Sequence, residues 1–155
     1  MSVPTRAALV AEAERWVGTP YCHQASRCGV GADCLGLVMG IWSAVAGSAI
    51  SLTRADQKHW AQHAKGEPLL HGLRVHLAEI DPLQALPGDL VALRWRHGWP
   101  ASHLAFVMGD GTIIHAYEGG AVVRSHLTPW TQHIAAAFTF PGMSEDTTAP
   151  ASKDI

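Results

Sequence analysis

The chain has 155 residues, of which 48% are hydrophobic and 15% charged, and its formal net charge is −2. This composition is typical of a folded, soluble protein and excludes a disordered chain, and the length suffices for one domain with its own core. The small negative charge argues against nucleic-acid binding, and no apolar run approaches the roughly 18 residues that span a bilayer. We therefore expect a single domain over residues 1–141 and a disordered polar tail over residues 142–155.

The beginning of the chain lacks the basic start and the apolar run of a secretory signal. We therefore expect synthesis in the cytoplasm, and any later export would need another route. The chain has three cysteines, an odd number, which argues against a disulfide framework and leaves at least one thiol free or paired between molecules.

The first predicted helix runs from Thr5 to Val17, where apolar residues recur at helical spacing. The helix is then ended by Gly18, Thr19 and Pro20. The stretch that follows, up to residue 33, is polar and contains glycines, which indicates a surface loop.

The second predicted helix begins at Cys34 and is the most regular segment of the chain. Asp33 stands at the N-cap position and Gly47 supplies the stop. One continuous apolar stripe is formed by Cys34, Leu37, Val38, Ile41, Trp42 and Val45. Because the opposite face is apolar too, we expect a buried central helix with Cys34 in its first turn.

Two further helices are predicted over residues 53–64 and after Pro68, the latter with apolar positions up to Ile80. After Pro87-Gly88 the pattern changes to short strands separated by turn signals. These strands are DLVALRW (89–95), SHLAFVM (102–108), TIIHAYE (112–118), AVVRSHL (121–127) and AAAFTF (135–140). Helices followed by an antiparallel meander predict an α+β fold, with the Cys34 helix packed on a sheet of five or six strands.

The position of Cys34 suits a nucleophile, because the dipole and unpaired N–H groups of a helix N-terminus favour the thiolate. The same N–H groups can receive the oxyanion of a tetrahedral intermediate. A lone helical cysteine is more often a core residue. Here the helix start and two histidines on later strands favour the nucleophile.

A cysteine nucleophile needs an imidazole within hydrogen-bond reach and a third group that orients the imidazole. His103 and His115 lie on consecutive predicted strands. A two-residue turn between these strands would place the two side chains on opposite faces. A three-residue loop over residues 109–111, with Gly111 in the left-handed conformation, pairs Ala105 with His115 and makes His103 its diagonal neighbour. A Cys-His-His triad therefore requires the three-residue loop, and without such pairing a strand histidine is more often a core residue.

Four segments carry a resemblance to a known family: VGTPY (17–21), ADCLGLV (32–38), PGDLV (87–91) and SHLAFVMGDGTIIHA (102–116). They occur in the order seen in NlpC-type cell-wall peptidases, which the chain resembles over about residues 5–140. The resemblance implies a circularly permuted papain-like fold and a cysteine peptidase that needs no cofactor. Its substrate would be an amide in peptidoglycan stem peptides, typically between γ-D-glutamate and a diamino acid.

The chain looks most similar to phage-type members found in tail modules and gene transfer agents. This implies phage-like tail proteins as partners, and delivery on a particle to the periplasm or cell wall. Two alternatives stay open. One is a non-catalytic tail hub or assembly protein that keeps the fold, and the other is a related thiol hydrolase or acyltransferase acting on a non-peptidoglycan amide or ester.

Carried over by position, the resemblance makes Cys34 the attacking thiol, His103 the base and then the acid, and His115 the group that orients His103. Tyr21 matches a tyrosine whose hydroxyl lies near the oxyanion, although it could simply cover the loop. Substrate-contacting positions are implied for Asp33, Leu35 and Ser102. The family has serine where this chain has Leu35, which leaves the cleaved bond open.

A zinc site is suggested by Cys22, His23, Cys28 and Cys34, since thiolate and imidazole are zinc ligands. The five-residue intervals between these cysteines do not match the short CxxC pairs of structural zinc sites. We expect no metal, and we interpret Cys22 and Cys28 as loop thiols.

Overall fold

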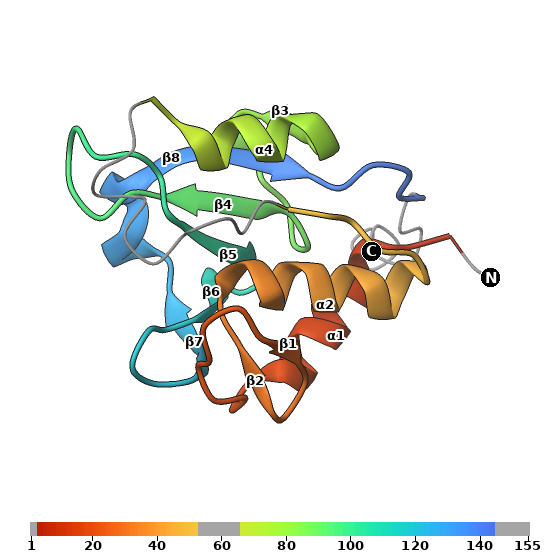
Figure 1. Cartoon of the computed structure of the whole chain (residues 1–155). Helices are drawn as coiled ribbons and strands as arrows, with labels where there is room; N and C mark the ends of the chain where they lie inside the picture. Colours follow the sequence, from red (N-terminus) through yellow and green to blue (C-terminus); the bar gives the residue numbers. More distant parts are fainter. Residues whose placement is uncertain (1–2, 53–65, 145–155) are drawn as a thin grey trace.

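The computed structural model describes residues 3–52 and 66–144, and in this part of the chain helices pack against an antiparallel sheet. Figure 1 shows α1 and α2 together with a small two-stranded hairpin below the sheet, and α4 beside β3 and β8. The bounds are α1 (Arg6–Trp16), β1 (Ser26–Arg27), β2 (Gly31–Ala32), α2 (Cys34–Ala46) and α4 (Pro68–His76). None of the helices in the described ranges is long and apolar enough to cross a membrane.

The main sheet has six strands in the order β3-β8-β4-β5-β6-β7, and neighbouring strands run antiparallel. Its strands are β3 (Ala78–Ile80), β4 (Leu90–Leu93), β5 (His103–Val107), β6 (Thr112–Ala116), β7 (Val122–His126) and β8 (Ile134–Thr139). Short 3-10 helices η1 (Pro82–Gln84) and η2 (Thr128–His133) precede β4 and β8. The expected α+β fold is confirmed, although only β4 to β7 form a meander. β8 returns to pair with β4, and so separates β4 from β3.

The two faces of the sheet contribute to separate apolar clusters. Leu104, Phe106 and Ile114 belong to the large cluster that also contains the buried residues of α1, α2 and α4. Their neighbours along the strands, such as Ala105 and Ile113, belong to a smaller cluster on the other face, where η2 packs. Because side chains alternate along a strand, one face of β5 and β6 packs in the large cluster and the other face packs in the small cluster.

The first two helices begin and end where their sequence signals predict. The Thr5 hydroxyl accepts a hydrogen bond from the N–H of Ala8 at 3.1 Å, which caps α1. The Asp33 carboxylate caps α2, and Gly47 ends it in the left-handed conformation at φ 75°. Local capping chemistry therefore fixes the residue at which α2 starts, which is Cys34.

The contact between α1 and α2 depends on a glycine. A Cβ atom at Gly40 would lie 2.3 Å from the indole of Trp16, so no larger residue fits without displacing that ring. Gly40 costs helix stability but lets the buried Trp16 side chain lie directly against α2. This packing holds α1 against α2.

The remaining predictions for the first half are confirmed in part. α4 matches the predicted helix after Pro68 but ends at His76, and Ile80 lies in β3 instead. The predicted surface loop before residue 33 contains the β1–β2 hairpin. The helix predicted over residues 53–64 lies outside the described residues. Of the tail predicted over residues 142–155, residues 145–155 also lie outside them, whereas Met143 packs against the large cluster.

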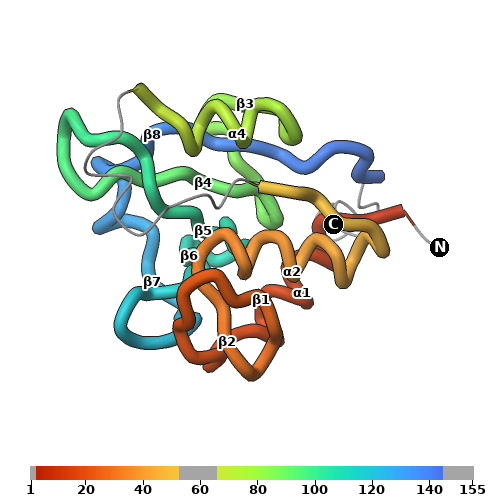
Figure 2. Tube along the Cα trace, viewed as in Figure 1, coloured from red at the N-terminus to blue at the C-terminus, as the bar shows by residue number. Residues whose placement is uncertain are grey.

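Arg6 connects the beginning of the chain to the sheet. Its guanidinium donates to the Asp89 carboxylate at 2.7 Å and to the carbonyl oxygen of Pro87 at 3.2 Å. Figure 2 shows both ends of the described chain on one side of the molecule, where the N–H of Ser144 donates to the carbonyl oxygen of Pro4 at 3.0 Å. The PGD segment (87–89) is therefore a structural anchor for α1.

Candidate active site

The N-terminus of α2 presents the half-buried thiol of Cys34. Asp33 fixes this turn, because its carboxylate accepts from the N–H of Gly36 at 2.8 Å and from the N–H of Gln24 at 2.6 Å. The Cys34 Sγ lies 3.8 Å from the carbonyl oxygen of Ser102. The start of α2 is therefore held beside the start of β5, where His103 follows Ser102 directly.

His103 and His115 form a direct hydrogen bond, with 2.8 Å between Nε2 of His103 and Nδ1 of His115. The hairpin register pairs Phe106 with Ile114, and continuing it by one residue places Ala105 opposite His115. Gly111 has φ 78°, as the three-residue loop requires. The hairpin predicted from the triad argument is confirmed.

The histidine pair lies on the face of the sheet that α2 does not cover. Leu93 is the Cα partner of His103, and Leu93 belongs to the small cluster on the η2 side. The apolar residues of α2 pack on the opposite face of the sheet, in the large cluster. The N-terminus of α2 instead meets the end of β5, where Cys34 contacts Ser102.

Aromatic rings cover both imidazoles. Trp95 lies 5.2 Å from His103 and Trp130 lies 5.4 Å from His115, measured between ring centroids. Burial, and to a lesser extent the neighbouring His115, lowers the pKa of His103 to about 3. Burial also lowers the pKa of His115. Both rings are therefore neutral near pH 7, and a neutral imidazole is the form that acts as a base.

Ser125 is a member of this network that the sequence did not reveal. Its hydroxyl oxygen lies 2.9 Å from Nε2 of His115 in a hydrogen bond. The register of β6 and β7 pairs Ile113 with Ser125, which makes Ser125 a diagonal neighbour of His115. A register argument for the turn at Gly119-Gly120, like that made for the preceding hairpin, would have been the available signal.

Tyr21 lies at the same end of the molecule as the thiol. Burial, together with the smaller effect of the negative charges of Glu118, Asp33 and Cys34, raises the pKa of Tyr21 to about 12. Its backbone N–H donates to the carbonyl oxygen of Gly120 at 2.9 Å. The structure thus brings Tyr21 close to Asp33 and Cys34, and its hydroxyl stays protonated.

The other predicted substrate positions differ in exposure. Leu35 is only 3% exposed and belongs to the large core cluster, so burial argues against a substrate contact there. The Ser102 hydroxyl is buried and has no hydrogen-bond partner among the described residues, although its backbone carbonyl contacts Cys34. The roles of Leu35 and Ser102 stay predictions.

Cys22, Cys28 and Cys34 form no disulfide in the described part of the chain. Within the described ranges, no group of three or more His, Cys, Asp or Glu side chains is arranged to hold a metal ion. His23 approaches Asp33, with 3.9 Å between Nδ1 and Oδ2. Among the described residues, no third His, Cys, Asp or Glu side chain joins this pair to make a metal site.

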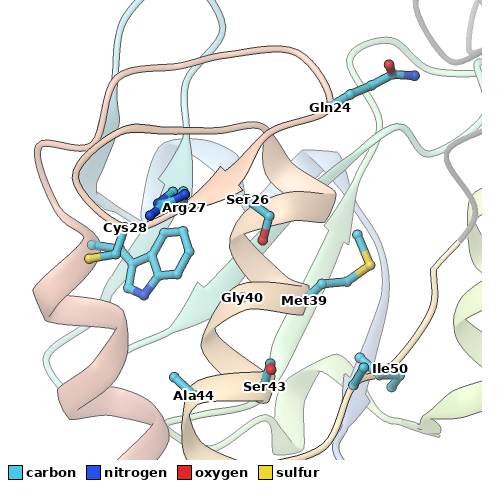
Figure 3. A pocket seen from close by; sticks show the side chains of 11 residues that line it. Gln24, Ser26, Arg27, Cys28, Met39, Gly40, Ser43, Ala44 and Ile50 are labelled. Atoms are coloured by element: carbon cyan, nitrogen blue, oxygen red, sulfur yellow. The ribbon is translucent and has the colours of Figure 1, made fainter.

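A separate groove of about 590 Å³ lies between α2, the end of α1 and the β1 region (Figure 3). None of the seven residues predicted for the site lines it. The lining residues are Trp16, Gln24, Ser26, Arg27, Cys28, Met39, Gly40, Ser43, Ala44, Ala49 and Ile50.

Comparison with known proteins identifies the family. The NlpC/P60 family model matches residues 18–139. The chain belongs to the NlpC/P60 family. This family comprises cysteine peptidases and hydrolases, and the matched range contains the thiol, both histidines and Tyr21.

Several relatives of this NlpC/P60 protein are known. Gamma-DL-glutamyl hydrolase of Bacillus subtilis (strain 168) is 29% identical over 120 residues, which cover 77% of this chain but 25% of that protein. The NlpC/p60 domain of the peptidoglycan hydrolase SagA superposes with a TM-score of 0.62 at 25% identity, covering 88% of this chain and 99% of that one. RipD of Mycobacterium tuberculosis, described as a non-catalytic NlpC/p60 protein adapted to peptidoglycan binding, shares the fold with a TM-score of 0.57 at 18% identity, covering 88% and 96%.

Proposed function

We propose that this NlpC/P60 protein is a cysteine peptidase that hydrolyses an amide bond in peptidoglycan stem peptides, with Cys34, His103 and His115 as its triad. The observation that carries the proposal is the 2.8 Å bond between the two buried imidazoles beside the start of α2. A chain that served only as a scaffold would not need this bond, because a buried polar pair is costly unless it is used or fully satisfied.

The proposed reaction begins with proton transfer from the Cys34 thiol to Nδ1 of His103. This is the ring nitrogen that does not take part in the hydrogen bond to His115. The sulfur then attacks the amide carbonyl, and the N–H groups of the first turn of α2 stabilise the oxyanion. His103 returns the proton to the leaving amine, which leaves a thioester on Cys34. Water, deprotonated by His103, hydrolyses this thioester and restores the thiol.

We propose a γ-D-glutamyl bond to a diamino acid as the cleaved amide. Two relatives support this choice, since one is named for γ-glutamyl hydrolysis and the other for peptidoglycan hydrolysis. Because Leu35 replaces the family serine, a different amide or an ester is the alternative substrate. A panel of defined γ-glutamyl and α-linked peptides distinguishes these substrates.

The test is to incubate wild-type protein and Cys34→Ala with purified peptidoglycan and to identify released fragments by mass spectrometry. Cys28→Ala is the matched control, because it also removes a thiol but lies outside the site. We expect the same fragments from wild type and Cys28→Ala and none from Cys34→Ala. Fragments from Cys34→Ala, or none from folded, reduced wild type, would contradict the proposal.

A binding-only function is the second candidate, since RipD is described as non-catalytic with the same fold. Selective labelling of Cys34 by a thiol probe at neutral pH separates the two, because an activated thiol reacts faster than an ordinary one. The binding-only function would be favoured if wild type binds peptidoglycan but shows no selective Cys34 labelling and releases no fragments.

We further propose that the enzyme acts on the cell wall from a phage-like tail. The support is the similarity of its motifs to phage-type family members. Mass spectrometry of purified particles from the producing strain tests the proposal. Absence of the protein from intact particles would contradict it.

A further inference from the structure

The ring of His115 has a second partner beyond the proposed triad. Nε2 of His115 lies 2.9 Å from the hydroxyl oxygen of Ser125, while Nδ1 is bonded to His103. His115 is fully buried, so both of its ring nitrogens need hydrogen-bond partners inside the protein. Ser125 supplies one of them from the neighbouring strand β7.

Two patterns of donors and acceptors are possible along the chain His103–His115–Ser125 in the resting state. A neutral imidazole carries one N–H, and a hydroxyl both donates and accepts. In the first arrangement, His103 donates from Nε2 to His115, and His115 donates from Nε2 to Ser125. Nδ1 of His103 then has a free lone pair. In the second arrangement, Ser125 donates to His115, His115 donates from Nδ1 to His103, and Nδ1 of His103 carries the proton.

Proton transfer from the thiol is compatible with the first arrangement alone. When the S–H bond of Cys34 breaks and an N–H bond forms at Nδ1, His103 becomes an imidazolium with a proton on each nitrogen. Its Nε2 must then donate, so Nδ1 of His115 must accept and the proton of His115 must sit on Nε2. That proton needs an acceptor, and the nearest partner is the hydroxyl of Ser125.

We propose that Ser125 is a positioning residue that holds His115 in the Nε2–H tautomer and thereby keeps Nδ1 of His103 available as the base. The proposal rests on the proposed cysteine peptidase function. His115 has no exposed surface and Trp130 lies 5.4 Å from its ring, so water does not readily replace a missing acceptor. Ser125 itself is half-buried on β7, which makes substitutions there compatible with folding.

The test compares Ser125→Thr with Ser125→Val, which have nearly the same shape and β-branching but differ in the hydroxyl. We expect Ser125→Thr to keep kcat/KM on peptidoglycan fragments within about threefold of wild type and Ser125→Val to lose about tenfold. The rate of Cys34 alkylation by iodoacetamide, followed against pH by peptide mapping, should fall at neutral pH in Ser125→Val alone. ¹⁵N NMR should show that His115 leaves the Nε2–H tautomer in the same variant.

Equal losses in both variants would assign Ser125 a packing role and overturn the proposal, as would equal activity and alkylation in both. An unchanged His115 tautomer in Ser125→Val would also overturn it. The alkylation and NMR measurements need no substrate. If wild type releases no peptidoglycan fragments, the proposed substrate fails while these measurements still decide the role of Ser125.

Discussion

The hydroxyl of Tyr21 is a neutral hydrogen-bond donor at any pH at which the enzyme would be assayed, because burial raises its pKa to about 12. A neutral donor near Cys34 suits a developing oxyanion better than it suits an uncharged ground state. We therefore predict that Tyr21→Phe lowers kcat/KM by about 10- to 100-fold while KM changes little.

Stopped assays on a soluble stem peptide measure this change, and urea denaturation of the same variant checks that the fold is intact. Tyrosine titration should add no pH dependence below about pH 10, given the raised pKa. Unchanged kcat/KM in a stable Tyr21→Phe variant would leave Tyr21 as a cover for the loop before the nucleophile.

The individual site residues differ in how far the sequence could predict them. Cys34 was predictable because the Asp33 cap is a local signal that fixes where α2 starts. His115 was predictable because one hairpin loop sets its register against His103. Ser125 was not found, because serine is common on exposed strands and its contact depends on a second register and on the direction of the His115 ring.

At the level of elements, the β5–β6 hairpin positions the histidine pair, and its loop depends on Gly111. With φ 78°, Gly111 adopts the left-handed conformation, which other residues adopt at a cost of about 1 kcal/mol. We predict that Gly111→Ala lowers the free energy of unfolding by about 1 kcal/mol in urea denaturation and also lowers activity.

Gly109→Ala is the matched control in the same loop. Gly109 is not among the positive-φ residues, and its Cβ would meet Pro87 at an ordinary contact distance of 3.6 Å. We expect stability and activity close to wild type. Equal effects of both substitutions would show that the loop conformation does not determine the alignment of the histidines.

The elements with local signals, β8 among them, were predictable, whereas the order of the strands in the sheet, which depends on distant pairing, was not. Caps and apolar periodicity predicted α1 and α2, and turn signals predicted β4 to β7. β8 is placed between β3 and β4 by pairings with residues 41 to 61 positions earlier, and its register shifts near Leu93. No local pattern encodes such an order, and the two-residue strands β1 and β2 are too short to show a periodicity.

For the whole molecule, Arg6 joins α1 to the sheet through a buried carboxylate. The Asp89 side chain is 1% exposed and also accepts from the N–H of Leu86 at 2.8 Å. Removing the guanidinium leaves this charge buried without its ionic partner. We predict that Arg6→Met lowers the free energy of unfolding by about 2–3 kcal/mol in urea denaturation, and that adding Asp89→Asn restores part of the loss.

Arg15→Met is the control, because the Arg15 side chain is 67% exposed and its pair with Glu12 is worth little in water. We expect a much smaller change than in Arg6→Met. If both variants lose similar stability, the Arg6–Asp89 salt bridge does not stabilise the packing of α1 against the sheet.

The buried histidines also make the stability of the whole molecule depend on pH. An unfolded histidine has a pKa near 6.5, whereas in the fold the pKa of His103 is lowered to about 3. Between these values the unfolded chain binds a proton that folded His103 does not, so stability is complete above about pH 6.5 and falls as the pH falls toward 3. We predict a loss of about 2 kcal/mol between pH 7 and pH 5 from His103, increased by His115, whose pKa is lowered in the same direction.

Urea denaturation at pH 7, 6 and 5 measures this slope. His103→Gln should flatten it, because glutamine keeps a polar group in the site but takes up no proton in this range. If the His103→Gln protein is as acid-sensitive as wild type, folded His103 takes up its proton over the same pH range as the unfolded chain. His103 would then be an imidazolium paired with the Cys34 thiolate rather than a neutral base.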